Sequence, residues 1–240
     1  MILDSYVYSS KGGRAHNEDF AAGRSMPGGG VFVLADGLGG HHHGELASKC
    51  VADTLLADDP AQGDDLPAWL EQRMRSANEN LLALQKEKNS NMKSTAVMLA
   101  VQGENASWAH VGDSRLYYFH RSAISAITDD HSVAYKKYKA GEITRAQIGQ
   151  DPDQPCLLRT MGSAGHSQPD VASCGKSLEP GDAFLLCTDG VWEYLRDEEA
   201  LVDLLKADSA KRWAELILLR VMERIEPGND NLSLITVLVG

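Results

Sequence analysis

The chain has few cysteines and no long apolar run. Its four cysteines, Cys50, Cys156, Cys174 and Cys187, are widely separated, and no two form a Cys-x-x-Cys pair. This spacing is typical of a protein from a reduced, cytosolic compartment. No apolar segment approaches the roughly 20 residues that cross a bilayer, and no basic leader precedes an apolar stretch near the N-terminus. We therefore expect a cytoplasmic protein that does not insert into a membrane.

Positive charge is also scarce. The sequence has 23 Lys and Arg against 34 Asp and Glu, which gives a formal net charge of -11. Such a chain lacks the broad basic surface with which proteins bind nucleic acids, so we expect no nucleic-acid partner. An acidic protein can still bind phosphate groups where metal cations lie between the two negative charges. The positions of the carboxylates are therefore the most informative feature of the sequence.

Strands and helices are expected in blocks along the chain. Short segments rich in β-branched or aromatic residues, bounded by glycine or polar clusters, predict strands, and apolar residues spaced three and four apart predict helices. The two kinds of segment do not alternate one for one, which favours an α+β fold with antiparallel sheets over a doubly wound parallel sheet. We expect strands at residues 3–9, 31–35, 95–101, 106–111, 116–119, 183–187 and 232–239, and helices at 44–57, 66–88, within 132–140 and at 209–225.

The sequence also predicts how the strands connect and how the chain divides into domains. The segment from Thr95 to Val111 reads as a hairpin, and the sequence GDSR after it predicts a turn into a further strand, giving an antiparallel meander. No repeat, low-complexity tract or linker interrupts the chain, so residues 1–240 are expected to form a single domain. Residues 129–158 are polar, with AGEIT in the middle, and are expected to form a surface flap that carries substrate contacts.

Several carboxylates lie at the ends of apolar segments. Asp36 follows VFVLA and Asp189 follows AFLLCT, and each precedes a glycine; Asp113 ends WAHVG, and Asp230 precedes NLSLITVLV. A carboxylate at the end of a buried strand is partly desolvated, so several that converge there must protonate or bind cations. Any one Asp-Gly pair is ordinary turn chemistry. Together, hard oxygen ligands without a neighbouring cysteine suit Mg²⁺ or Mn²⁺.

Five motifs in this order resemble the metal-dependent Ser/Thr protein phosphatases, the type 2C or PPM family. They are RAHNED (14–19), ADGLGGH (35–41), VGDSR (111–115), CTDGVWE (187–193) and GNDNLS (228–233). The segment DHS…AGEIT…LLRTMGS…PDV is similar to the flap of that family and the strand that follows it. Each motif alone is weak, but the resemblance covers almost the whole chain. It implies a four-layer αββα sandwich, in which two antiparallel β-sheets are flanked by helices, of the bacterial stand-alone type.

The resemblance implies a binuclear Mn²⁺ or Mg²⁺ centre at one edge of the sandwich. Asp36 would bridge two ions and the Gly37 carbonyl would ligate one of them. Asp189 and Asp230 would complete the shell of the other ion. Asp113 matches the aspartate that helps to hold a third, weaker ion in bacterial members, together with the position of Asp189.

The same resemblance implies hydrolysis of phosphoserine and phosphothreonine in proteins by a water that the two cations activate. Arg14 matches the phosphate-binding arginine of the family, and a guanidinium can bind two phosphoryl oxygens at once. Glu18 and Asp19 match acidic positions that bind a metal directly or through waters. His41, in the bacterial form Asp-Gly-x-Gly-Gly-His, is a candidate proton donor to the leaving group, and a metal-bound water is the alternative.

The partners implied are a phosphorylated Ser/Thr protein and a cognate Ser/Thr kinase, as for bacterial phosphatases that oppose a kinase. Two other classes of function are compatible with the same scaffold. A non-catalytic phosphoprotein-binding module would typically lack one or more of the metal aspartates, all of which this chain has at 36, 113, 189 and 230. A metal-dependent phosphodiesterase would cleave a diester faster than a phosphopeptide.

Overall fold

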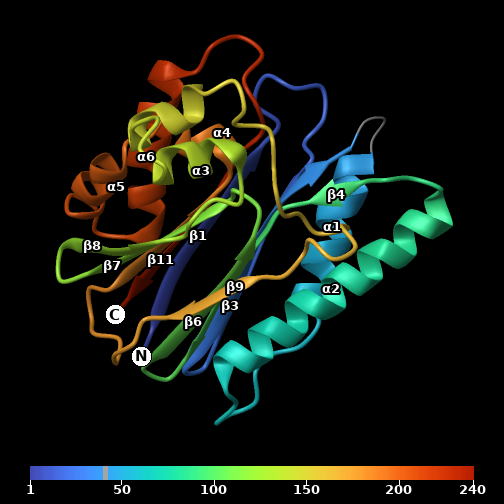
Figure 1. Ribbon diagram of the computed structural model, residues 1–240. Helices are drawn as coiled ribbons and strands as arrows, with labels where there is room; N and C mark the ends of the chain where they lie inside the picture. The colour runs from blue at the N-terminus through green and yellow to red at the C-terminus, as the bar shows by residue number, and fades with distance from the viewer. Residues whose placement is uncertain (40–42) are drawn as a thin grey trace.

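The computed structural model describes residues 1–39 and 43–240. Two antiparallel β-sheets pack face to face, and helices cover the outer face of each sheet (Figure 1). Helices α1 (His43–Leu55) and α2 (Leu66–Lys88) cover one sheet, and α3 (Val133–Lys139), α5 (Asp197–Leu204) and α6 (Ala210–Arg224) lie on the other side. The predicted α+β sandwich with four layers is confirmed.

The two sheets are built from strands that are distant in sequence. The larger has the order β2-β3-β5-β6-β9, with β4 beside β3, and the smaller has the order β1-β11-β10-β7-β8. The strands of the larger sheet are β2 (Asp19–Met26), β3 (Gly29–Leu38), β4 (Lys93–Ser94), β5 (Ala96–Gln102), β6 (Asn105–Val111) and β9 (Asp170–Ser173). Those of the smaller are β1 (Leu3–Ser10), β7 (Arg115–His120), β8 (Ala123–Ile127), β10 (Ala183–Cys187) and β11 (Leu232–Val239).

The uninterrupted apolar run in β3 serves two hydrophobic cores. Val31, Val33 and Ala35 pack in the cluster that includes α1 and α2, whereas Phe32 and Leu34 belong to the cluster between the sheets. All five side chains are fully buried. Because successive side chains of a strand point to opposite faces, a strand covered on both faces must be apolar at every position.

Helix α2 was predicted with its observed bounds, 66–88. The side chain of Asp65 caps the first turn by accepting the Ala68 N–H at 3.3 Å, and Asn89 ends the helix in the left-handed conformation. Its buried positions recur at intervals of three and four, which is the helical period. They are Leu66, Leu70, Met74, Ala77 and Leu81. Among the described residues, no helix is both long enough and apolar enough to span a membrane.

The predicted meander is wrong at one point. Strands β5 and β6 form the expected hairpin, but β7 pairs with β8 and β10 in the other sheet. The GDSR turn therefore carries the chain between sheets rather than to a neighbouring strand. Gly112 lies at this crossing with φ +104, and a Cβ there would come within 2.7 Å of Thr95. Asp113 is consequently placed where the two sheets meet.

Strand β2 was not predicted. Its sequence, DFAAGRSM, has few residues with high β-propensity. Tertiary contact compensates for this, because β2 pairs with β3 along all eight of its residues. Gly23 lies against the ring of Phe32, where a Cβ would be 2.3 Å from ring carbon Cδ1. The strand thus depends on its neighbour rather than on its own composition.

The segment 129–158 contains α3 and a short 3-10 helix, η1 (Arg145–Gln150). Its apolar residues Ala134 and Ile148 pack in the core of the smaller sheet. Lys137 Nζ lies 2.8 Å from Asp151, which ties α3 to the residues that follow η1. Arg145 pairs with Asp197 at the start of α5. The segment is therefore anchored to the helical layer that covers the smaller sheet.

The packing of the two sheets against each other can be tested by a substitution in the core between them. Phe184 is fully buried there and stacks on Tyr118, with ring centroids 4.9 Å apart. We expect Phe184→Ala to lower the free energy of unfolding by about 3–5 kcal/mol, because the cavity left behind fills only partly. Urea unfolding with an unchanged m-value measures the loss. Leu219→Ala, at a 57% exposed position of α6, is the control and should change stability by less than about 0.5 kcal/mol. Similar losses in the two variants would contradict the two-sheet core.

Candidate metal centre

Acidic side chains from several parts of the chain meet in a cavity of about 800 Å³ at one edge of the sandwich. Asp19 is buried behind the cavity rather than in its lining, and its charge acts on Asp36. His41, the expected proton donor, lies outside the described residues. The cavity brings together the other predicted site residues, namely Arg14, Glu18, Asp36, Gly37, Asp113, Asp189 and Asp230.

Asp36 is held through its backbone. It lies within β3 rather than at its end, because β4 pairs with Gly37 and Leu38 and so prolongs the strand. The Asp36 N–H donates to Thr95 Oγ1 at 2.9 Å, and its carbonyl accepts the Thr95 N–H at 2.8 Å. Burial, together with the negative charge of Asp19, raises the pKa of Asp36 well above its usual range. The side chain is thus fixed in a place that disfavours its charged form.

Asp19 begins β2 directly opposite Asp36 in the strand pairing. Thr188 Oγ1 donates to its carboxylate at 3.0 Å. Burial raises the pKa of Asp19 to about 7, and the charges of Asp189 and Asp230 add to the effect. The pairing of β2 with β3 thus brings two carboxylates to the same edge of the sheet.

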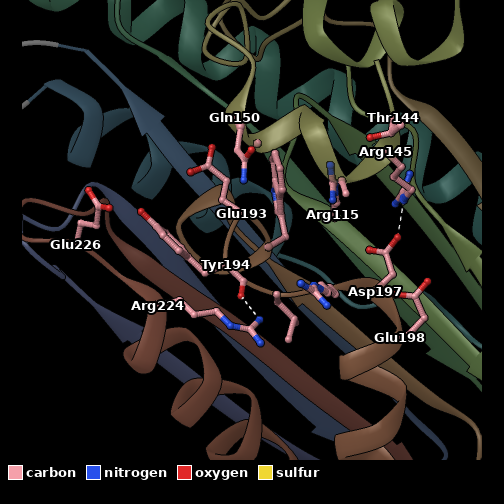
Figure 2. Close-up of a pocket in the computed structure, with 15 residues that line it drawn as sticks. Arg115, Thr144, Arg145, Gln150, Glu193, Tyr194, Asp197, Glu198, Arg224 and Glu226 are labelled. Atoms are coloured by element: carbon pink, nitrogen blue, oxygen red, sulfur yellow. Dashed lines mark hydrogen bonds and ion pairs between the residues drawn. The ribbon is translucent and has the colours of Figure 1, made fainter. Parts of the chain in front are cut away.

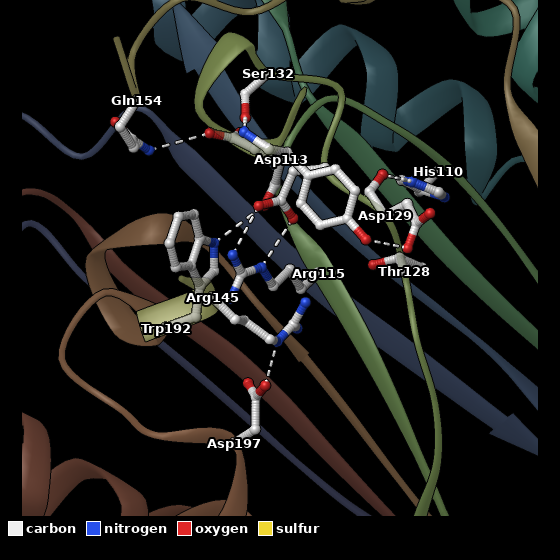
Figure 3. Close-up of polar contacts among 12 residues, drawn as sticks. His110, Asp113, Arg115, Thr128, Asp129, Ser132, Arg145, Gln154, Trp192 and Asp197 are labelled. Carbon is white, nitrogen blue, oxygen red and sulfur yellow. Dashed lines mark hydrogen bonds and ion pairs between the residues drawn. The ribbon is translucent and has the colours of Figure 1, made fainter. Parts of the chain in front are cut away.

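Asp113 is enclosed by neutral donors (Figure 3). Trp192 Nε1 donates to its carbonyl at 3.0 Å, and Gln154 Nε2, from the segment 129–158, lies 3.2 Å from its carboxylate. The guanidinium of Arg115 lies 3.6 Å from the centre of the Trp192 ring and pairs with Asp130 through two hydrogen bonds. Burial and the charge of Asp189 raise the pKa of Asp113 well above its usual range.

Asp189 and Asp230 lie on two segments that are in close contact. Asp189 begins the short helix α4 (Asp189–Trp192), and Gly190 donates its N–H to the Asp189 carboxylate at 2.7 Å. A Cβ on Gly190 would be 1.9 Å from the carbonyl oxygen of Asn231, so the close approach requires glycine. Burial, with the charge of Asp230, raises the pKa of Asp189 to about 6.

Asn231 organises the loop that carries Arg14 and Glu18. Its side-chain oxygen accepts the Glu18 N–H at 2.8 Å, and its amide nitrogen donates to the carbonyls of Lys11 and His16 at 2.9 Å. Arg14 lies at the open side of the cavity, where its guanidinium pairs with Asp230 at 2.7 Å. About half of each of these two side chains is exposed, so the pair is screened by water.

Gly37 and Gly44 bring the backbone close to Glu18. A Cβ on Gly37 would be 2.0 Å from the Gly44 carbonyl oxygen and 2.7 Å from the Glu18 carbonyl oxygen. A Cβ on Gly44 would be 2.6 Å from the carboxyl carbon of Glu18, which places that carboxylate beside the first turn of α1. The Gly37 carbonyl, one of the expected ligands, therefore lies on backbone with no room for a side chain.

Glu193 is a further acidic residue of the cavity, which the sequence did not single out. Burial raises the pKa of Glu193 to about 8, and the charges of Asp189 and Asp230 contribute. It also lines a neighbouring cavity of about 820 Å³ between residues 144–150 and 192–198 (Figure 2). The Arg145–Asp197 pair lies in that second cavity, which has equal numbers of arginine and acidic residues in its described lining.

Three neutral residues that organise the site were also not predicted from the sequence. Asn231 could have been noted, because it follows Asp230 in the motif GNDNLS. Thr95 begins an expected strand, and Gln154 lies in a segment without periodicity, so neither position signalled contact with a distant aspartate. Their partners, at Asp36 and Asp113, are 59 and 41 positions away.

The donor set fits a hard divalent cation. Arg14 is the only lysine or arginine in the described lining of the cavity, and it lies at the exposed side. The buried carboxyl groups therefore lack a positive charge, and burial raises their pKa values. Carboxylate and backbone carbonyl oxygens are the ligands that Mg²⁺ and Mn²⁺ favour. The pKa values are raised at Asp19, Asp36, Asp113 and Asp189, and the cavity adds the Gly37 carbonyl and the carboxylate of Asp230, which is half-exposed and paired with Arg14.

Known proteins share this architecture. The protein phosphatase PhpP of Streptococcus pneumoniae is 30% identical over 81% of this chain and 80% of its own length. The serine/threonine protein phosphatase PstP of Mycobacterium tuberculosis is 33% identical over 85% of this chain and 40% of its own length. Two solved structures also match. The serine/threonine phosphatase Stp1 of Staphylococcus aureus has a TM-score of 0.87 at 27% identity, covering 100% of this chain and 96% of that one.

The second structure is the catalytic domain of PstP in complex with two manganese ions, with a TM-score of 0.83 at 27% identity, covering 98% of this chain and 97% of that one. A family model described as protein phosphatase 2C matches residues 9–215. Since that match spans most of the chain, and PhpP and PstP are at least 30% identical over most of it, the chain belongs to the protein phosphatase 2C family of PPM-type protein-serine/threonine phosphatases.

Proposed function

We propose that the chain hydrolyses phosphoserine and phosphothreonine in proteins with a water activated at a binuclear Mn²⁺ or Mg²⁺ centre. The observation that carries this proposal is the group of buried carboxyl groups with raised pKa values in a cavity that has Arg14 at its open side. The manganese complex of PstP supports the choice of metal. In this proposal residues 1–240 act as a single catalytic domain, with residues 129–158 as its flap.

Each carboxylate has a proposed place in the centre. Asp36 would be a ligand of both ions, the Gly37 carbonyl of one, and Asp189 and Asp230 of the other. Asp113, with Asp189, would hold a weaker third ion. Glu18 and Asp19 would bind a metal directly or through waters; Asp19 accepts from Thr188 and does not line the cavity.

When bound, the ions would supply an activated water and neutralise charge on the phosphoryl oxygens. The residues of the chain hold and orient the reacting groups. Arg14, which pairs with Asp230 in this structure, would donate to two phosphoryl oxygens through its planar guanidinium. The fixed backbones of Asp36 and Asp113 keep the carboxylates in place, so little reorganisation is needed during the reaction. The proposed partners are a phosphorylated protein and the Ser/Thr kinase that opposes this enzyme.

The first test is turnover by the purified protein. We expect Mn²⁺-dependent release of phosphate from a phosphothreonine peptide, and its loss in Asp36→Asn, because an amide cannot bridge two cations as a carboxylate does. Asp53→Asn is a matched control, since Asp53 is exposed on α1 and paired only with Lys49 among its described contacts. Absence of turnover with both Mn²⁺ and Mg²⁺, together with retained phosphopeptide binding, would favour a binding module. Faster cleavage of a diester would favour a phosphodiesterase.

A second test concerns Arg14. Replacement by alanine removes a charge-assisted hydrogen bond to the substrate, so kcat/KM for the phosphopeptide should fall about ten- to a hundredfold. Arg14→Lys should recover only part of the loss, since an ammonium group cannot bind two oxygens in the same plane. Steady-state kinetics at saturating Mn²⁺ measures both values. An unchanged kcat/KM in Arg14→Ala would remove Arg14 from the proposed site.

The pKa shifts predict how pH affects the metal-free protein. The folded state raises the pKa of Asp19 from 3.8 to about 7 and that of Asp189 to about 6, so it binds more protons than the unfolded state between these values. Stability should therefore fall as the pH rises from about 4 to about 7. Urea unfolding in a chelator measures the decline, and saturating Mg²⁺ should reduce it by restoring stability at pH 7 more than at pH 5. Equal stabilisation at the two pH values would argue against cation binding at these carboxylates.

A further inference from the structure

His131, in the sequence DHS, is a buried residue to which the proposed function gives no role. Only 6% of its surface is exposed. Its Nδ1 atom lies 3.2 Å from the N–H of Gly112, and its own N–H donates to the Gly112 carbonyl at 2.9 Å. One residue therefore binds both polar backbone groups of Gly112, which lies directly before Asp113.

These contacts define the tautomer of His131. Because the Gly112 N–H is a donor, Nδ1 must carry a lone pair, and the proton of the neutral ring lies on Nε2. Nε2 is 3.1 Å from a carboxylate oxygen of Asp170, the first residue of β9, and donates to it. Arg159 Nη1 binds the other oxygen of Asp170 at 2.6 Å and also lies 3.3 Å from Nε2, but a proton on Nδ1 would leave two donors facing each other at Gly112 and no donor for the near oxygen of Asp170. Burial, with the nearby charge of His110, lowers the pKa of His131 to about 4, so the ring stays neutral near pH 7.

The same group of side chains could be taken for a metal site. Ligand atoms of His110, His131 and Asp170 all lie within 4.8 Å of one another, as judged over the residues the structure describes. A metal on His131 Nε2 would require the proton on Nδ1, where it would face the Gly112 N–H. His110 already donates through Nε2 to the Asp129 carbonyl at 2.9 Å, and Arg159 occupies Asp170. The hydrogen bonds therefore favour a relay from carboxylate to imidazole to backbone over a metal site.

The relay ends on a turn that is held at every residue. Gly112 has φ +104, a conformation that depends on its surroundings. Beyond it, the Asp113 carbonyl accepts from Trp192, and the Ser114 hydroxyl lies 2.7 Å from Thr95 Oγ1. Arg115 closes the turn by pairing with Asp130, the residue before His131. Two adjacent residues at the base of the segment 129–158 thus hold the two ends of the GDSR turn.

We propose that His131 is a positioning residue for Asp113: in the tautomer set by Asp170, its Nδ1 fixes Gly112 and thereby aims the Asp113 carboxylate into the cavity. The part of this inference that concerns a metal rests on the proposed function. The part that concerns the tautomer and the turn does not, because both are properties of the metal-free protein.

Two substitutions of His131 test the contact of Nδ1 with Gly112 and that of Nε2 with Asp170 separately. In His131→Asn the amide oxygen takes the place of Nδ1 and can still accept the Gly112 N–H. In His131→Gln the amide nitrogen takes the place of Nε2 and can donate to Asp170, but no acceptor faces Gly112. His120→Asn is the control for the loss of a buried histidine, since His120 is 6% exposed and binds Asp182 instead.

Nuclear magnetic resonance in a chelator tests the relay without activity. Wild-type protein should show His131 protonated on Nε2, and the Gly112 amide should be protected from hydrogen exchange. Protection should persist in His131→Asn and in His120→Asn, and fall in His131→Gln. A ring protonated on Nδ1, or equal protection in the Asn and Gln variants, would overturn the proposal. These readings stand even if the protein shows no turnover.

Manganese titration tests the consequence for Asp113. His131→Gln should raise the Mn²⁺ concentration for half-maximal turnover on the order of tenfold, with KM for the phosphopeptide unchanged, while His131→Asn stays within about threefold of wild type. Titration of bound Mn²⁺ by electron paramagnetic resonance should show the same order of variants, whether or not the protein turns over. Unchanged Mn²⁺ dependence in His131→Gln would overturn the positioning role even if the tautomer is as expected.

Discussion

Repulsion between buried carboxylates is the constraint on which the site depends. Asp19, Asp36, Asp113 and Asp189 are each raised in pKa by burial and by the charges of their neighbours. Side chains on flexible loops would move apart to escape this repulsion, or protonate. Here three of the four begin an element or lie within one, and Asp113 lies in a turn bound on all sides. The rigid sandwich therefore keeps these carboxyl groups together in spite of their mutual repulsion.

Close backbone contacts are the means by which the sandwich gathers these residues. At Gly37 a side chain would collide with Gly44, and at Gly190 it would collide with Asn231. The two glycines lie directly after Asp36 and Asp189, so the Asp-Gly pair is needed here for packing between segments. Turn chemistry alone, which the sequence also allowed, does not explain either glycine, because each packs tightly against the backbone of another segment.

The parts of the fold that follow local rules were predictable, and the parts that follow from tertiary contact were not. Helix α2 has a period and a cap, and strands β10 and β11 are apolar runs, so their bounds were found from sequence. Strand β2 has no such signal and exists because it pairs with β3. From the sequence, the GDSR turn was predicted to connect neighbouring strands of one sheet. No local feature shows that the chain passes from one sheet to the other at Gly112.

The candidate site shows the same division. Motif order identified the family and the aspartates that meet in the cavity. The residues that hold these aspartates were not predicted, since Thr95, Gln154 and Trp192 contact aspartates many positions away. Pairing distances of this kind are set by the sheet register and the crossing turn, which sequence patterns do not specify. A sequence motif thus identifies the charged residues of the site but not the residues that orient them.

The orienting groups share one chemical property, which explains why they are so placed. Thr95 accepts the Asp36 N–H and shares a hydrogen bond with Ser114, and Trp192 donates to the Asp113 carbonyl. These contacts fix the backbones and are uncharged. A buried lysine or arginine would neutralise the carboxylates and occupy the oxygens that a cation needs. Arg115, which is buried nearby, is instead bound to Asp130 and stacked on Trp192. The fold thus immobilises Asp36 and Asp113 with neutral groups rather than with a buried cationic side chain.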